Sequence, residues 1–458
     1  MFSKMDATAI SKLIATREIS VQEVTEYFLE RIERLDKYLG CYVTVTPGLA
    51  LDMAKKADHL LSEIPDFEVP PFFGVPIAIK DNIDVEDVVT TWGSLDRIDE
   101  ATGDDNVVSI LKDSNLPILG KTNLPEFALP CHTENLLGIS TKNPWNDSVT
   151  PGGSSGGSAA AVSAGLAPIA LGTDAGGSVR IPASCCGVVG FRPSTGSISS
   201  GLSDFSPTLL SSPGILARSG RDAATLFRII SRSMPGDIIG PRITSQICPE
   251  SIRVGVAANP MTPGISVAPE CRAAVDQVAL KLAEMGADVS EIDLGQDDFA
   301  SEAFRETWSV VAASFEIFDE ECLDPFTLMM RDYGSAVSGV RLHKNLELFR
   351  GIALMMEQFV FSQVDILLTP TLAEVPPAVG TFTASNDQHE NFARMARFMP
   401  FTPMYNITGM PSVNVPFFQH DGLPIGVLFG ANYGNESVLL DLVDGLVSPS
   451  DTICPIWS

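Results

Sequence analysis

The chain has 458 residues, of which 45% are hydrophobic, so it holds enough apolar material for a large buried core. Lys and Arg number 30 against 57 Asp and Glu, and the resulting net charge of −27 argues against direct nucleic-acid binding because phosphates are repelled. The eight cysteines include neither a CxxC pair nor a zinc-site spacing, and the N-terminus lacks a secretory signal, so a reducing cytoplasm is the expected location.

The predicted elements alternate between helices and short apolar strands, as expected of a sheet covered by helices. Ser20 and Glu23 form a capping-box pattern before an amphipathic helix that runs to about Leu35. Asp104 or Asp105 is expected to cap a helix that runs through Leu111. Further helices are predicted at 49–61 and 156–165, and strands at 74–80, 116–120, 168–172, 252–257, 364–370, 411–417 and 423–430.

The chain shows no linker, repeat or low-complexity tail, so we expect one elaborated α/β domain over residues 1–458. Its core is expected at about 5–230 and 360–445. The stretch 231–359 is less patterned, with helices expected at 269–285, 303–328 and 341–361. We interpret this stretch as a cap that walls a substrate pocket.

One stretch could suggest a membrane span, because residues 148–173 carry no charge over 26 positions. It opens on TPGGSSGGS, however, whose glycines and polar side chains suit a loop rather than lipid. No membrane partner is therefore expected.

Two Gly-Gly-Ser units, at 152–154 and 176–178, lie in this charge-poor part of the chain. Glycine at such density is useful where the backbone turns sharply or approaches something closely. Two loops of this kind could bring both serines to one place and leave backbone N–H groups free to bind an oxyanion. A serine-based acyl-transfer site is the favoured interpretation, and a flexible or phosphate-cradling loop is the alternative.

Competing motifs can be compared at the same positions. A P-loop would end in the LGKT of 119–122, but Asn115 stands where its first glycine should be. GGSSG at 152–156 fits the GxSxG nucleophile elbow with Ser154 as the nucleophile. That mechanism needs a later histidine, and the choices, all in polar surroundings, are His343, His389 and His420.

Lys80 offers a different base for a serine. It ends the apolar strand VPIAIK, and a buried amine gives up its proton more readily because desolvation disfavours the ammonium form. A lysine at a strand end is often a surface residue with its charge in water, so this role competes with a structural one.

Several segments together resemble the amidase signature family over about residues 5–230 and 360–445. They are GVPIAIKDNI, ILGKTNLPEFA, KNPWN, PGGSSGGSAAAVSAG, LGTDAGGSVRIPASCCGVVGFRPSTG, FTPMYNITGMPSVNVPF and DGLPIGVLFGA. The resemblance implies the fold of that family, a mixed central sheet with helices on both faces. It also implies an amide hydrolase that needs neither a metal nor an organic cofactor.

The resemblance implies a catalytic triad in which Ser178 is the nucleophile, Ser154 in a cis peptide is the relay, and Lys80 is the base. The implied oxyanion hole consists of backbone N–H groups at Ala175, Gly176, Gly177 and Ser178. Supporting or substrate-binding roles are implied for Ala128, Ser155, Asp174 and Arg180. For Asp174, a loop-capping role is an equal alternative.

Three classes of function remain open at this point. The first is a free-standing amidase for small linear or cyclic amides, a group that includes 6-aminohexanoate cyclic dimer hydrolases. The second is the glutaminase component of glutamyl-tRNA amidotransferase, its A subunit, which typically has an acidic residue near 401–409, where this chain has none. The third is a binding protein that has lost catalysis. The oligomeric state stays open, with a homodimer as one option.

Overall fold

The computed structural model describes residues 2–65, 68–199, 208–231, 252–296 and 298–448, together with 452, 454, 456 and 457. Part of the predicted cap, residues 232–251, therefore lies outside the described residues.

The described residues form one large mixed sheet and one small hairpin. The large sheet contains β1 (Tyr42–Val45), β2 (Ile77–Lys80), β5 (Ile118–Thr122), β6 (Ile169–Asp174), β7 (Val189–Arg192), β8 (Ser212–Ala217), β9 (Arg253–Val256), β10 (Asp288–Glu291), β11 (Ile366–Pro370), β12 (Ser412–His420) and β13 (Leu423–Ala431). Its 11 described strands run in the order β1-β5-β2-β6-β8-β7-β12-β13-β11-β9-β10. Strands β5, β2 and β6 are parallel, as are β11, β9 and β10, whereas the middle of the sheet is antiparallel. The hairpin consists of β3 (Val89–Thr90) and β4 (Asp99–Glu100).

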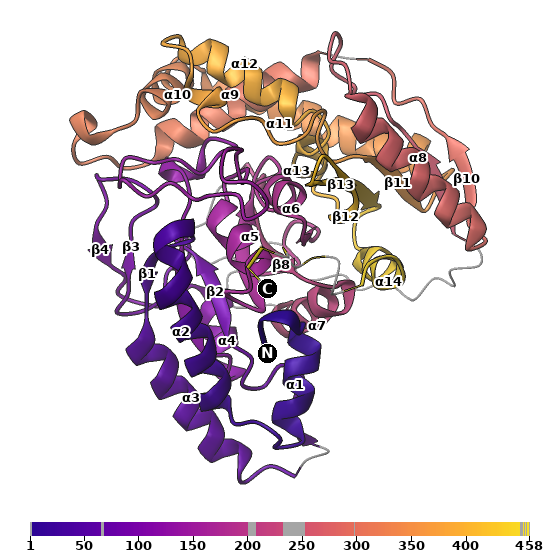
Figure 1. Ribbon diagram of the computed structural model, residues 1–458. Helices are drawn as coiled ribbons and strands as arrows, with labels where there is room; N and C mark the ends of the chain where they lie inside the picture. The colour runs from indigo at the N-terminus through magenta and orange to yellow at the C-terminus, as the bar shows by residue number, and fades with distance from the viewer. Residues whose placement is uncertain are drawn as a thin grey trace.

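Helices surround this sheet (Figure 1). They are α1 (Ala7–Ala15), α2 (Val21–Leu39), α3 (Pro47–Leu61), α4 (Asn106–Asp113), α5 (Gly156–Ser163), α6 (Arg180–Cys186), α7 (Gly220–Ile230), α8 (Pro269–Glu284), α9 (Phe299–Ser314), α10 (Pro325–Ser335), α11 (Gly339–Met355), α12 (Gln388–Phe398), α13 (Pro403–Thr408) and α14 (Glu436–Leu446). Short 3-10 turns lie at η1 (Phe2–Lys4), η3 (Glu126–Ala128), η6 (Glu320–Cys322) and η8 (Thr381–Thr383), and a π-helical turn, η7 (Met356–Val360), follows α11.

Helices cover both faces of the sheet, as predicted. A Cβ placed on Gly190 of β7 would lie 2.4 Å from the Cβ of Ala183, so Gly190 faces α6. The ring of its neighbour, Phe191, packs edge-on against Phe227 of α7, with 5.4 Å between ring centroids. Because successive strand residues point to opposite faces, α6 and α7 lie on opposite sides of the sheet.

The capping-box prediction is confirmed, and the prediction for the 104–111 helix is confirmed in part. Ser20 and Glu23 bond reciprocally at the start of α2. Asp105 stands at the N-cap position of α4, but its side chain makes no capping bond there. Its carboxylate accepts instead from the backbone N–H of Asp84, at 2.9 Å.

Helix α5 is made of small residues because it runs through the interior. All eight of its residues are buried. A Cβ on Gly157 would lie 2.5 Å from the backbone nitrogen of Asn123 and 2.5 Å from the carbonyl oxygen of Cys41. A larger residue would push the helix away from both segments, so glycine here permits close approach, as the sequence suggested.

Helices α9 to α12 gather at one end of the molecule (Figure 1). The helix predicted over 303–328 is in fact two helices, because α9 ends at Ser314 and α10 begins with proline at Pro325. Helix α12 packs on α10 although it comes from the 360–445 segment, which the sequence assigned to the core.

Candidate active site

Lys80 ends β2 inside the protein. Its side chain is fully buried, with 0% exposure. The Nζ atom lies 2.7 Å from Ser154 Oγ and 2.9 Å from Thr173 Oγ1, with the Thr173 carbonyl oxygen at 3.4 Å. Strands β2 and β6 are parallel neighbours, so their carboxyl ends, which carry Lys80 and Thr173, meet at the same edge. The lysine is therefore not a surface residue.

Thr173 and Asn82 are polar neighbours of Lys80 that sequence reasoning missed. The Asn82 amide donates to Thr173 Oγ1 at 3.0 Å, and the same oxygen accepts from Lys80. Two donors converging on one hydroxyl oxygen fix the position of the lysine amine. The available signal was the place of Thr173 in the GTDAGGS segment, next to the predicted strand end.

The backbone that leads into Ser154 is closely packed against a neighbouring loop. The Gly153–Ser154 peptide bond is cis, the geometry that the family resemblance implies. A Cβ on Gly153 would lie 2.2 Å from the carbonyl oxygen of His132, closer than atoms can approach. Glycine at 153 is thus required by the neighbouring loop. The Ser154 side chain itself is fully buried.

Ser178 lies beside this pair but is more accessible than Ser154. Its side chain is half-buried, and its carbonyl oxygen accepts from the backbone N–H of Ser155 at 3.0 Å. The Ser155 hydroxyl in turn donates to the carbonyl oxygen of Thr173, at 3.3 Å. Within the described part of the chain the Ser178 hydroxyl has no hydrogen-bond partner, so the step from Ser178 to Ser154 stays a prediction.

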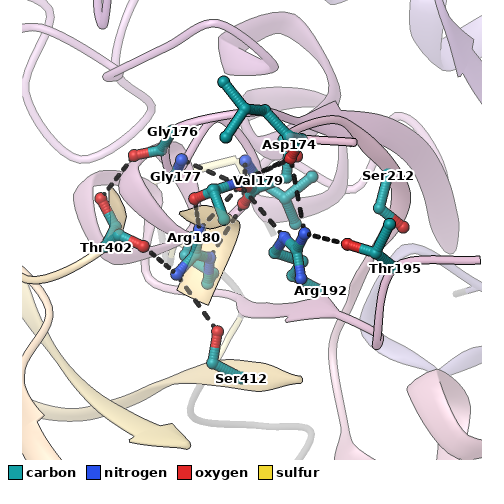
Figure 2. Close-up of polar contacts among 12 residues, drawn as sticks. Asp174, Gly176, Gly177, Val179, Arg180, Arg192, Thr195, Ser212, Thr402 and Ser412 are labelled. Carbon is teal, nitrogen blue, oxygen red and sulfur yellow. Dashed lines mark hydrogen bonds and ion pairs between the residues drawn. The ribbon is translucent and has the colours of Figure 1, made fainter. Parts of the chain in front are cut away.

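The turn that carries Ser178 is built around Asp174 (Figure 2). The two carboxylate oxygens accept from the backbone N–H groups of Gly177 and Val179, at 2.8 and 3.1 Å. They also accept from Arg180 Nε and Nη2, at 2.9 and 2.7 Å. Asp174 is therefore both the cap of this loop and the ion-pair partner of Arg180, whereas the sequence predicted a supporting or substrate-binding role with loop capping as the alternative.

The prediction that the Gly177 N–H belongs to the oxyanion hole requires correction. The N–H of Gly177 is already bonded to Asp174, so it is not free for an oxyanion in this structure. The N–H groups of Ala175, Gly176 and Ser178 have no acceptor among the described residues, and these three remain the predicted donors. The glycine at 177 is needed because its φ is 125° and a Cβ would lie 2.2 Å from Thr402 Oγ1.

Arg180 ties the turn to a segment more than 220 residues further along the chain. Its guanidinium donates to the Thr402 carbonyl at 2.8 Å, to Asn406 Oδ1 at 2.7 Å and to Ser412 Oγ at 3.1 Å. Thr402 also donates through its hydroxyl to the Gly176 carbonyl, at 2.7 Å. Figure 2 shows Thr402 and Ser412 facing Arg180 from the C-terminal segment. Sequence reasoning missed these partners.

Burial and charge together set the ionisation of this cluster. Burial by itself raises the pKa of the Asp174 carboxyl, but Arg180, Arg192 and Asn406 outweigh it, and the net pKa lies well below the usual range. Burial lowers the pKa of Arg192 to about 10, with Asp174 3.9 Å away opposing the shift. The carboxylate is therefore charged at any physiological pH and holds the turn as an anion.

A small cavity opens at Ser178, which we call the inner cavity. It has a volume of about 30 Å³, and none of its lining side chains carries a charge. The walls are Leu129, Pro130, Cys131, Gly176, Ser178, Ile181, Phe304, Trp308, Phe326, Phe392, Met395, Ala396 and Met399. Ala128, the predicted substrate-binding residue, is not among them, although its neighbour Leu129 is. Helices α9, α10 and α12 therefore roof the site.

The histidine-dependent alternative finds no support in this geometry. His343, His389 and His420 are all exposed, and none lines the inner cavity. Ser154, the nucleophile in that alternative, is fully buried and does not line the inner cavity, whereas Ser178 does. A nucleophile elbow would instead present its serine to the substrate.

A protein-family model described as amidase matches residues 23–440. The chain belongs to the amidase signature family. Among characterised folds, this amidase superposes on 6-aminohexanoate cyclic dimer hydrolase with a TM-score of 0.92 and 28% identity, over 100% of both chains. The family resemblance and the mixed α/β sheet expected from the sequence are both confirmed.

Sequence relatives of the amidase fall into two kinds. The putative amidase AmiB2 of Mycobacterium bovis is 35% identical, over 95% of this chain and 94% of its own. The A subunit of glutamyl-tRNA(Gln) amidotransferase from Persephonella marina is 32% identical, over 98% of both chains. The amidase is a hydrolase of this family. Because its sequence identities to the two kinds of relative are similar, identity alone does not distinguish a free-standing amidase from an amidotransferase subunit.

No described helix is both long and apolar enough to cross a membrane. Nor do three or more His, Cys, Asp or Glu side chains gather, within the described ranges, in a way that could hold a metal ion.

Proposed function

We propose that this amidase is a free-standing hydrolase of small uncharged amides that works through an acyl-enzyme on Ser178. The observation that carries the proposal is the contact of 2.7 Å between Lys80 Nζ and Ser154 Oγ, directly beside the turn that presents Ser178. A buried amine next to a buried hydroxyl, with a second and more accessible serine close by, is the arrangement needed for a proton relay.

The proposed first half-reaction forms the acyl-enzyme. Ser178 Oγ attacks the amide carbonyl carbon while its proton passes to Ser154 and the Ser154 proton passes to the neutral Lys80 amine. The tetrahedral oxyanion is stabilised by backbone N–H groups of the turn, each worth about 3 kcal/mol in other enzymes. The C–N bond then breaks, and the leaving amine takes the proton back from Lys80 through Ser154.

The second half-reaction uses water. A water molecule takes the place of the departed amine and attacks the acyl carbon, giving its proton to the same relay. The bond from the acyl carbon to Ser178 Oγ breaks, Ser178 regains its proton, and the carboxylic acid leaves. Ser154 can serve in both directions because a hydroxyl both donates and accepts.

The walls of the site support a neutral substrate rather than glutamine. Free glutamine carries an ammonium and a carboxylate, and burying either group without a partner is unfavourable. None of the side chains that line the inner cavity is charged. The segment 401–409 likewise contains no acid that could pair with the ammonium. These features favour the free-standing amidase over the glutaminase of an amidotransferase.

The test combines labelling with turnover. A fluorophosphonate probe is expected to label the wild-type protein at Ser178, as located by peptide mass spectrometry, and to leave Ser178→Ala unlabelled. Hydrolysis is then measured for a panel of neutral amides and for free glutamine. We expect the neutral amides to be hydrolysed only when Ser178 is present, and glutamine not to be hydrolysed. Unchanged amide turnover in Ser178→Ala would reject the mechanism, and ammonia release from glutamine would favour the amidotransferase function.

A further inference from the structure

A second, larger cavity lies beside the inner cavity, and we call it the outer cavity. Its volume is about 600 Å³, against about 30 Å³ for the inner one. The two cavities share four wall residues, Phe304, Phe392, Ala396 and Met399. The side chains of these residues therefore stand between the space at Ser178 and the larger space behind it.

Phe304 is the shared wall residue that reaches the nucleophile turn. A Cβ on Gly176 would lie 3.0 Å from Cζ of Phe304, with the two Cε atoms at 3.7 and 3.9 Å. The tip of the ring therefore points at Gly176, two residues before Ser178. A Cβ at position 176 would press on the ring, which would have to move by a few tenths of an ångström.

The Phe304 ring is held in this position by its neighbours. It stacks on Trp308 of the same helix, with 6.4 Å between centroids and planes 16° apart. The indole Nε1 of Trp308 donates to the Leu129 carbonyl at 3.4 Å, which fixes the pair against the opposite wall. Phe304 also belongs to a buried apolar cluster with Ala175 and Phe349. The ring is a packed partition rather than a loose side chain.

The two cavities differ in the size of the substrate group that each can hold. A cavity of about 150 Å³ is what accommodates a benzene ring, so the inner cavity accepts a group of only a few heavy atoms. The outer cavity is large enough for a longer chain, and its walls are mainly apolar, as at Met261, Ile265, Leu294 and Ile352.

We propose that Phe304 sets the length of amide that reaches Ser178, by closing the outer cavity off from the inner one. This inference rests on the proposed function of Ser178. The wild-type protein is accordingly selective for amides with a short apolar group on the side that enters the inner cavity. Removing the ring joins the two cavities and admits long-chain apolar amides.

The experiment compares Phe304→Ala and the milder Phe304→Leu with the wild type. The substrates are 4-nitroanilides of acetic, hexanoic and decanoic acids, and the acetamides of butylamine and decylamine, so that either side of the scissile bond can occupy the cavity. We expect the ratio of kcat/KM for the longest to the shortest member of one series to rise at least tenfold in Phe304→Ala. Phe304→Leu should give a smaller rise in the same series.

Phe318→Ala is the matched control, because Phe318 is an exposed phenylalanine that lines neither cavity. It leaves the walls of both cavities intact, so its decanoyl-to-acetyl ratio is expected to stay within about threefold of wild type. The gating role would be overturned if the ratio of kcat/KM for the longest to the shortest substrate stayed unchanged in both series for Phe304→Leu. The same holds for Phe304→Ala, provided that thermal melting shows this variant to be folded. Failure of the proposed function looks different, since wild type and Ser178→Ala would then turn over every substrate equally.

Discussion

Lys80 Nζ and Ser154 Oγ lie 2.7 Å apart, and both side chains are completely buried. No bulk water is needed to carry a proton between them. The neighbouring hydroxyl of Thr173 gives the amine a second contact, at 2.9 Å, which leaves it little freedom to turn away from the serine.

Replacing Lys80 by methionine tests its role as the base. The side chain keeps its length but loses the amine, so we expect kcat to fall by about 10²–10⁴-fold, the range typical of general acid–base groups. The substitution conserves side-chain volume but removes the hydrogen bonds that Lys80 donates to Ser154 and Thr173, so the free energy of unfolding should fall by about 1–3 kcal/mol and the protein should stay folded. Steady-state kinetics and calorimetry measure the two effects.

Lys112→Met is the control, since Lys112 is half-buried in an ion pair with Asp104, and neither residue lines the inner cavity. Its kcat should stay within about twofold of wild type. A Lys80→Met enzyme that kept near-wild-type kcat would show that another group accepts the Ser178 proton.

Asp174→Asn should destabilise the fold in a pH-dependent way. The substitution leaves the buried Arg180 guanidinium without its anion, and breaking such a pair typically costs about 3–5 kcal/mol. Because the pKa of Asp174 is lower in the folded state than in the unfolded one, its contribution is present above the unfolded pKa of about 3.9 and is lost as pH falls through the folded value. The difference from wild type should therefore shrink from pH 7 towards pH 3.

Urea unfolding at pH 7, 5 and 3 provides this measurement. Asp421→Asn is the control, because the Asp421 side chain is 90% exposed and should show no comparable loss at any pH. A gap between Asp174→Asn and wild type that stayed constant over the whole range would mean that the carboxylate charge is not what stabilises the turn.

Gly153→Ala should damage catalysis through the backbone. The added Cβ would lie 2.2 Å from the His132 carbonyl oxygen, so the chain must shift and carry Ser154 with it. A displacement of about 1 Å in a catalytic group can cost about 10²-fold in rate, and we expect kcat to fall by at least that factor.

Gly351→Ala supplies the comparison for that variant. Gly351 lies within α11, and nothing approaches its Cβ position within 4 Å. Alanine there should stabilise the helix by up to about 1 kcal/mol with activity unchanged. Equal activities of the two alanine variants would contradict the proposed constraint at position 153.

The fold was predictable where a buried element has a clear hydrophobic pattern in the sequence. Strands β2, β6 and β11 are continuous apolar runs because they are buried on both faces, and the sequence predicted all three. Strand β10 (Asp288–Glu291) was missed because it is a short edge strand whose side chains are mostly exposed and polar. Strand β8 was missed as well, since SPGILA has no alternation to distinguish it from a loop.

The site was predictable where its residues stand in marked local segments. The Gly-Gly-Ser loops and the apolar run before Lys80 marked both serines and the lysine as candidates, and the structure brings Lys80 and Ser154 into contact, while their catalytic roles stay predictions. The partners of Arg180 were not predictable, because they come close only when β12 pairs antiparallel with β7, with Ser412 opposite Arg192. No local pattern near Thr402 or Asn406 indicates that pairing.

The bonds from Arg180 to Thr402, Asn406 and Ser412 have a consequence for how the enzyme matures during synthesis. A ribosome that has made about the first 200 residues has already delivered the lysine and both serines. The segment 402–412, whose residues bond to Arg180 and hold the turn of Ser178, has not yet been translated at that moment. The nascent chain therefore carries the predicted catalytic groups before the segment that braces their turn exists, and this arrangement can form only after residues 402–412 have been added.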